Sequence, residues 1–120
     1  MKTAVTSRGK NLDSMVDPRF GRCGWFIIVD TKTGQYQAVS NELNSDLSQG
    51  AGIQAAENVA RLGVKLVITG HCGPKAFRVL RSAGIRVYSG CEGTVSDVLE
   101  RLKEGDLRET DTADVEGHWA

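Results

Sequence analysis

The chain has no long apolar run and no leader-like start. None of its 120 residues belongs to a hydrophobic stretch approaching the roughly 18 residues that a membrane span needs. The opening residues, MKTAVTSRGK, are too short and too polar for a signal peptide. We therefore expect a cytoplasmic protein. A chain of this length forms one domain and buries about two-thirds of its unfolded surface, so it needs no disulfide or structural metal.

Cysteine is scarce, and the three residues Cys23, Cys72 and Cys91 form no recognisable framework. An odd number of cysteines cannot pair completely within one chain, and the close spacings of zinc motifs are missing. Free thiols in a reducing compartment are the simplest interpretation. Because a single cysteine is often a small buried hydrophobe, a structural role stays open for each of them.

The chain also lacks net charge, since 15 basic side chains balance 15 acidic ones. The balance is uneven along the sequence: the segment after Lys103 has six acidic residues and one base, and the preceding body has 14 bases and 9 acids. That excess permits an anionic partner, although an ordinary solvated face would also explain it. It is too small for a nucleic-acid-binding protein, and no basic stripe alternates with aromatic residues.

Segments with strand-type and helix-type apolar patterns alternate along the chain. This order predicts an α/β fold with a mixed five-stranded sheet flanked by helices. Strands are expected at residues 2–6, 25–30, 35–40, 64–70 and 85–90. Helical periodicity begins near Gly50, at Pro74 and near Thr94. The short TKTG turn makes the second and third strands an antiparallel hairpin, whereas the later strands should be parallel neighbours. Residues 1–105 form the predicted domain, and residues 106–120 are expected to be an acidic, mobile tail.

A ligand site is expected beyond the carboxyl ends of the parallel strands. The loops at residues 7–24, 70–74 and 89–93 should meet there. Cys72 and Cys91 each follow a strand and precede a helix, one helix-strand unit apart. Because neighbouring strands lie only about 5 Å apart, we expect these two cysteines to share one rim.

Positive charge and helix starts favour an anion at this rim. The beginning of a helix presents unpaired N–H groups and the positive end of its dipole. The glycine-rich SQGAG, at residues 48–52, adds a similar edge but lacks the lysine and hydroxyl of a phosphate-binding loop. Cationic walls could come from five residues of the rim loops, namely Arg8, Lys10, Arg19, Arg22 and Lys75.

Catalytic interpretations find little support in the residues. His71 adjoins Cys72, but adjacency in sequence does not supply the geometry of a catalytic pair. The first strand carries no carboxylate for a two-metal nuclease, and Cys72, Cys91 and His71 reproduce no standard zinc spacing. Sulfur ligands would instead select copper(I) or iron–sulfur species.

Three segments, PRFGRCGWFIIVD, GAGIQAAENVARLGVKLVITG and GHCGPKAFRVLRSAGIRVY, carry a family resemblance. Together they resemble the dinitrogenase iron-molybdenum cofactor biosynthesis family of the NifX and NifB C-terminal type, over about residues 2–105. The resemblance implies a ribonuclease H-like fold and a non-enzymatic carrier of an anionic cluster, held largely without covalent protein ligands. It implies no nuclease activity, because the nuclease carboxylates are missing.

Within this family the chain resembles members that carry a molybdenum-copper sulfide cluster, and the alternative is iron-molybdenum cofactor or its precursor. A protein donor or acceptor of the cluster is the implied partner, with no nucleic acid or membrane. An adaptor acting through protein contacts also stays open. The tentative metal ligands are Cys72, His71 and Cys23. The full expected cluster-binding set is Arg8, Arg19, Phe20, Gly21, Arg22, Gly50, Ala51, Gly52, Ile53, Gly70, His71, Cys72, Gly73, Pro74, Lys75 and Cys91.

Overall fold

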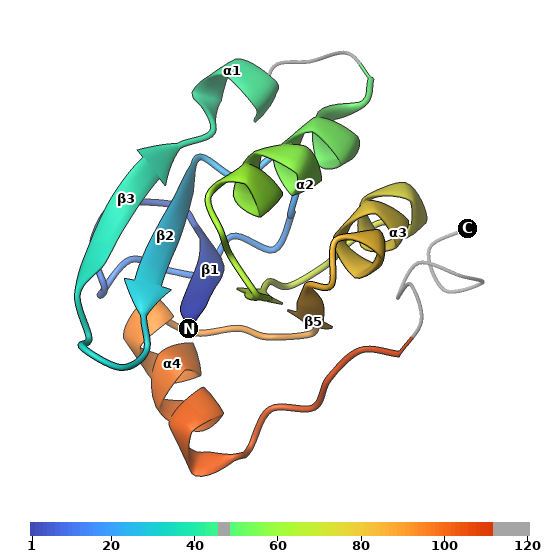
Figure 1. Ribbon diagram of the computed structural model, residues 1–120. Coiled ribbons are helices and arrows are strands. Elements are labelled where there is room, and N and C mark those ends of the chain that lie inside the picture. Colours follow the sequence, from blue (N-terminus) through green and yellow to red (C-terminus); the bar gives the residue numbers. More distant parts are fainter. Residues whose placement is uncertain (46–48, 112–120) are drawn as a thin grey trace.

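The computed structural model describes residues 1–45 and 49–111 (Figure 1). Its elements follow in the order β1 (Lys2–Ser7), β2 (Trp25–Asp30), β3 (Tyr36–Ser40), α1 (Glu42–Ser45), α2 (Ala51–Arg61), β4 (Leu66–Ile68), α3 (Pro74–Ser82), β5 (Arg86–Tyr88) and α4 (Val95–Glu104). The sequence pattern predicted each of these except the single turn α1. No helix in the described ranges is long and apolar enough to cross a bilayer.

The strands form one mixed sheet in the order β3-β2-β1-β4-β5, which confirms the predicted architecture. β1 pairs antiparallel with β2. β2 pairs antiparallel with β3, because the turn after Asp30 folds the chain directly back. β4 pairs parallel with both β1 and β5, as the intervening helices require. The carboxyl ends of β1, β4 and β5 therefore lie at one edge of the molecule.

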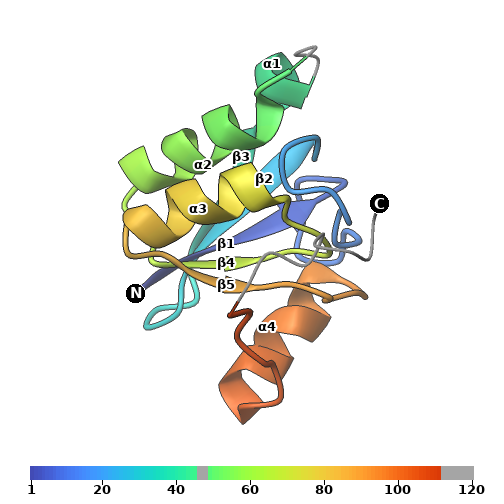
Figure 2. The ribbon, with the colours of Figure 1, turned by 90° about the vertical axis from the view of Figure 1, so that its right-hand side faces the viewer.

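Helices cover both faces of the sheet, with α2 and α3 on one face and α4 on the other (Figure 2). The alternating side chains of the strands supply a core to each layer. Ala4 and Val67 pack in the cluster under α2 and α3, whereas Val5 and Ile68 pack in the cluster under α4. The sheet thus divides the interior into two separate cores.

The segment after α4 contradicts part of the expected tail. Thr110 donates its backbone N–H to the carbonyl of Val87 at 2.7 Å, and Glu109 pairs with Arg86 at 3.0 Å. Leu107 packs against the core cluster under α4. The prediction of a mobile tail is therefore wrong for residues 106–111, because these contacts fix them along the β5 edge. Residues 112–120, the rest of the predicted tail, lie outside the described residues.

Candidate functional site

A pocket of about 640 Å³ lies where the loop at residues 19–22 meets the beginnings of α2 and α3. Both helices start on the same side of the molecule, at the carboxyl edge of the parallel strands (Figure 2). The pocket is lined by Arg19, Phe20, Gly21, Arg22, Gln49, Gly50, Ala51, Gly52, Ile53, His71, Gly73, Pro74, Lys75 and Ala76. Most of the expected cluster-binding residues are thus brought together here.

The long loop between β1 and β2 divides into two parts with different neighbours. Its first part is pinned to the start of α4, where Val16 N–H donates to Gly93 at 2.8 Å and Ser96 N–H donates to Leu12 at 2.8 Å. Its second part turns to the β4–α3 connection, where Phe20 N–H donates to the carbonyl of His71 at 3.1 Å. The three expected loops therefore meet, but only the second part of this loop reaches the pocket.

Two glycines allow the backbone segments around the pocket to approach each other closely. A Cβ atom on Gly21 would lie 2.6 Å from the backbone nitrogen of Gly52, at the beginning of α2. A Cβ atom on Gly70 would lie 2.6 Å from the Cα atom of Pro18. Such distances leave no space for a side chain, so glycine is required for the close approach at both positions. The pocket wall formed by residues 19–22 therefore contacts the start of α2 directly through backbone atoms.

The two helices that begin at the pocket have no side-chain N-cap. Gly50 precedes α2 in the left-handed region, with φ 80°, and Gly73 precedes α3. In contrast, the N-terminus of α4 is closed by a capping box between Thr94 and Asp97. The first N–H groups of a helix have no partner inside the helix, and they carry its positive dipole end. Two such ends at one pocket favour an anion.

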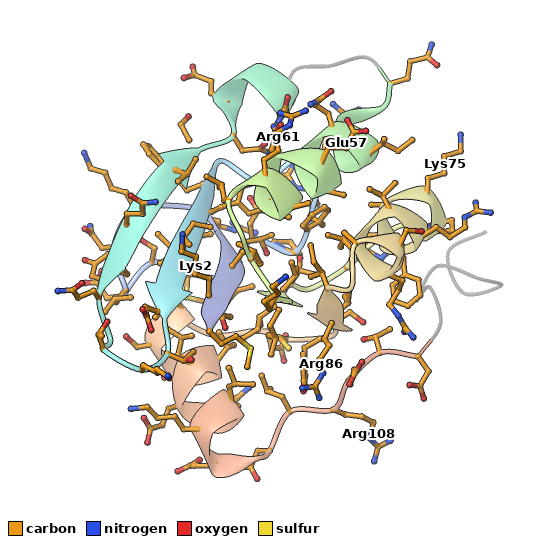
Figure 3. All side chains as sticks on the ribbon, in the orientation of Figure 1. Lys2, Glu57, Arg61, Lys75, Arg86 and Arg108 are labelled. Carbon is orange, nitrogen blue, oxygen red and sulfur yellow. The ribbon has the colours of Figure 1, made fainter. Side chains whose placement is uncertain are left out.

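Cationic side chains complete the electrostatics of the pocket. Arg19, Arg22 and Lys75 all line it, and Lys75 extends outward from the start of α3 (Figure 3). Arg19 pairs with Asp17, with Nε to Oδ1 at 3.2 Å, and this hydrogen bond raises the pKa of the guanidinium. The guanidinium of Arg19 therefore stays protonated near neutral pH.

Two supporting residues were not found from the sequence. Asp17 is buried next to Arg19, although in the sequence it is an ordinary acidic residue of the loop. Asn41, also buried, donates Nδ2–H to the carbonyl oxygens of Gly21 at 3.2 Å and Cys23 at 2.9 Å. Both residues hold the backbone of the pocket wall from behind. A buried polar residue in a loop has no periodicity, so the pattern of the sequence gives no signal for it.

The expected thiol-bearing rim is wrong for Cys91. Cys72 packs in the core cluster under α2 and α3, together with Cys23, whereas Cys91 packs in the cluster under α4. The loops themselves are neighbours, since Cys91 N–H donates to the carbonyl of Thr69 at 3.2 Å. However, the helices that follow β4 and β5 lie on opposite faces of the sheet, and each cysteine packs on the face covered by the helix that comes after it.

The remaining expected residues do not line the pocket. Arg8 is exposed, in the part of the loop pinned toward α4. Gly70 packs against Pro18, and the side chains of Cys23 and Cys72 are buried. Among residues 1–45 and 49–111, no three His, Cys, Asp or Glu side chains are grouped to hold a metal ion. The pocket is suited to an anion held by charge and N–H groups.

The buried thiols should resist alkylation in the native protein. Burial, with Asp17 nearby, raises the pKa of Cys23 to about 12, and burial also raises the pKa of Cys91. Iodoacetamide at pH 8 is expected to modify none of the three cysteines rapidly, because attack requires an accessible thiolate. Mass spectrometry should find three adducts only after denaturation. Rapid native modification of Cys23 would contradict its burial.

The same raised pKa predicts a loss of stability in alkaline solution. An unfolded thiol ionises near pH 8.5, whereas Cys23 keeps its proton in the folded state until about pH 12. Unfolding therefore releases a proton above about pH 8.5, and the free energy of unfolding falls as the pH rises toward 12. Denaturant titrations between pH 8 and 11 measure this decline, which a Cys23→Ala variant should reduce.

A second hollow, of about 630 Å³, lies at the other end of the sheet between α4 and the β2–β3 turn. Its lining includes Leu66, Tyr88, Leu99 and Leu102, and it shares no residue with the first pocket. None of the expected cluster-binding residues lines it. The chemistry predicted from the sequence therefore belongs to the pocket at the helix beginnings.

Comparison with protein families gives a match to the dinitrogenase iron-molybdenum cofactor family over residues 1–105. The chain belongs to this family. Family membership thus extends over the whole sheet and all the helices. A curated relative, an uncharacterized protein of Methanocaldococcus jannaschii, is 30% identical over 98 residues, covering 79% of this chain and 82% of the relative.

Solved structures of similar proteins have the same fold. The apo form of the orange protein from Desulfovibrio gigas is 41% identical, with a TM-score of 0.90, over 92% of this chain and 93% of that one. A putative NifB protein from Thermotoga is 36% identical, with a TM-score of 0.80, over 94% of this chain and 97% of that one. The family and the likeness to the orange protein together favour a carrier that binds a cofactor.

Proposed function

We propose that this protein is a non-enzymatic carrier of an anionic molybdenum-copper-sulfur cluster, which is its cargo. The observation that carries the proposal is the convergence of two uncapped helix N-termini and three cations on one pocket. The resemblance of the sequence to family members that carry a molybdenum-copper sulfide cluster favours this cargo over other anions. The residues proposed to hold it are Arg19, Phe20, Gly21, Arg22, Gly50, Ala51, Gly52, Ile53, His71, Gly73, Pro74 and Lys75.

Charge and backbone N–H groups are proposed to do most of the binding. Helix-terminal N–H groups donate to sulfur or oxygen of an anion without a change in protonation. Guanidinium groups add planar donors with a charge that does not titrate near neutral pH. His71 lines the pocket and is the remaining candidate for a direct ligand, whereas Cys72 and Cys23 would first have to leave the core. The proposal therefore requires no thiolate ligand.

Reconstitution tests the proposal directly. Tetrathiomolybdate and copper(I) are added to the apo-protein, and the mixture is passed through gel filtration. We expect a defined chromophore that travels with the protein at a fixed ratio of molybdenum and copper to polypeptide. A Cys72→Ala variant should retain it. A featureless spectrum, with metals that separate from the protein on the column, would refute the carrier function.

Iron-molybdenum cofactor or its precursor is the second candidate cargo, because the matching family is described by that cofactor. Both cargoes are anionic and fit the same electrostatics, so the geometry of the pocket does not separate them. Elemental analysis of protein purified from its native host separates the two cargoes. Copper with molybdenum supports the first cargo, whereas iron without copper reverses the order.

A further inference from the structure

Asp17 is a buried acid beside a pocket that attracts anions. Its exposed fraction is 2%, yet both of its carboxylate oxygens face Arg19. Oδ1 accepts hydrogen bonds from the backbone N–H of Arg19 at 3.0 Å and from its Nε at 3.2 Å, and Oδ2 accepts from Nη2 at 3.4 Å. The carboxylate therefore holds both the backbone and the guanidinium plane of one pocket residue.

Asp17 is itself fixed to the ends of the parallel strands. Its N–H donates to the carbonyl of Thr6 at 2.9 Å, and its carbonyl accepts from the hydroxyl of Thr6 at 2.7 Å. The same hydroxyl lies 2.9 Å from Oγ1 of Thr69, which follows β4. All three residues are buried. A rigid chain of contacts thus runs from β1 and β4 through Asp17 to the Arg19 side chain.

We propose that Asp17 is a positioning residue that fixes the direction of the Arg19 guanidinium at the pocket, an inference that rests on the proposed function. A guanidinium carries five N–H donors in one plane. The bonds to Asp17 use one edge of that plane, so the group turns its remaining donors toward a ligand in a set direction. The exposed fraction of the Arg19 side chain is 62%, so without this bond the side chain would rotate in solvent.

Removing the carboxylate has two opposite effects on an anion. Orientation is lost, which weakens binding because the ligand must now order the side chain itself. A negative charge is also lost, which strengthens attraction to the pocket at low ionic strength. Salt separates these effects, since the Debye length is about 10 Å at 0.1 M and about 3 Å at 1 M ionic strength.

The Asp17→Asn variant tests the inference. Asparagine keeps an oxygen for the Arg19 N–H, but it replaces the second carboxylate oxygen with an N–H donor. Binding of the cluster assembled from tetrathiomolybdate and copper(I) is measured by titration at both salt concentrations. In 1 M sodium chloride we expect affinity to fall about fivefold relative to wild type. In 0.1 M salt the loss should shrink or vanish. A residue with only a structural role would weaken binding equally at both concentrations.

A double-mutant cycle identifies the side chain through which Asp17 acts. In an Arg19→Gln background, Asp17→Asn should not change affinity in 1 M salt. If Asp17→Asn does not fold, Arg19→Lys decides the question, because lysine keeps the charge but cannot form the planar fork. The Arg19→Lys variant should show the same loss of affinity in 1 M salt as Asp17→Asn.

Different failures have different meanings. Wild-type protein that binds no cluster overturns the proposed function and this inference with it. A wild-type protein that binds, with Asp17→Asn and Arg19→Lys equal to it in 1 M salt, overturns the positioning role alone. A loss that persists in the Arg19→Gln background also overturns it.

Discussion

Replacing Arg19, Arg22 and Lys75 together by glutamine is expected to weaken binding of the molybdenum-copper cluster by about a hundredfold or more. All three cations line one pocket. A hydrogen bond to a charged group contributes about 1.5–3 kcal/mol, so even two such contacts correspond to this factor. Titration of the apo-variant with tetrathiomolybdate and copper(I), followed by the absorbance of the cluster, measures the change.

A matched control separates local charge from net charge. Glutamine at Arg61, Lys65 and Lys103 removes the same number of positive charges, but none of these residues lines the pocket. Arg61 lies in the last turn of α2, away from its N-terminus (Figure 3). The control should bind the cluster within about threefold of wild type, since exposed charges beyond a Debye length are screened. Equal losses in both variants would contradict binding at this pocket.

Substituting Gly21 by alanine is expected to damage the same site without removing any charge. The new Cβ atom would lie 2.6 Å from the backbone nitrogen of Gly52 and 2.7 Å from its Cα atom. Backbone cannot yield as a flexible side chain can, so the loop must move away from α2. Overpacking of this kind costs about 1–3 kcal/mol of stability. Because the shift carries Arg19 and Arg22 with it, we expect cluster binding to fall at least about tenfold.

Gly24→Ala is the matched control in the same loop. The nearest atom to its added Cβ would be the carbonyl oxygen of Arg8, at 3.8 Å, which is ordinary contact. Gly24 does not line the pocket. Circular dichroism melting and the reconstitution assay, applied to both variants, give stability and binding separately. A Gly21→Ala protein with wild-type melting and wild-type binding would show that this glycine contact does not shape the site.

Much of the fold follows from local pattern. The continuous apolar run WFIIVD reflects a strand buried on both faces, and the helical stripe of residues 51–61 reflects burial on one side, and the sequence records both patterns directly. The tight turn after Asp30 requires a hairpin, and the later helices require parallel crossovers. The segment at residues 106–111 was misread because Thr110 and Glu109 make their contacts with β5, far away in the chain.

The site was predicted in part, for an equally physical reason. Residues 19–22 and the glycines near α2 and α3 could be placed from the resemblance, and the structure brings them to one pocket. Asp17 and Asn41 are themselves buried and hold this loop through hydrogen bonds. Partners of that kind depend on which loops meet, and no periodicity marks them.

The sequence by itself determined the elements other than α1, the mixed character of the sheet and the loops that gather at the carboxyl edge. Tertiary structure alone decided which face each helix covers. Cys72 and Cys91 occupy equivalent places along the chain, but α3 and α4 lie on opposite faces, so the two thiols enter separate cores. A strand-to-helix junction looks the same locally whichever way the helix turns. The packing of the whole sheet decides which face each helix covers. Here it buries the thiols in the cores, so the pocket is lined by cations and helix N-termini.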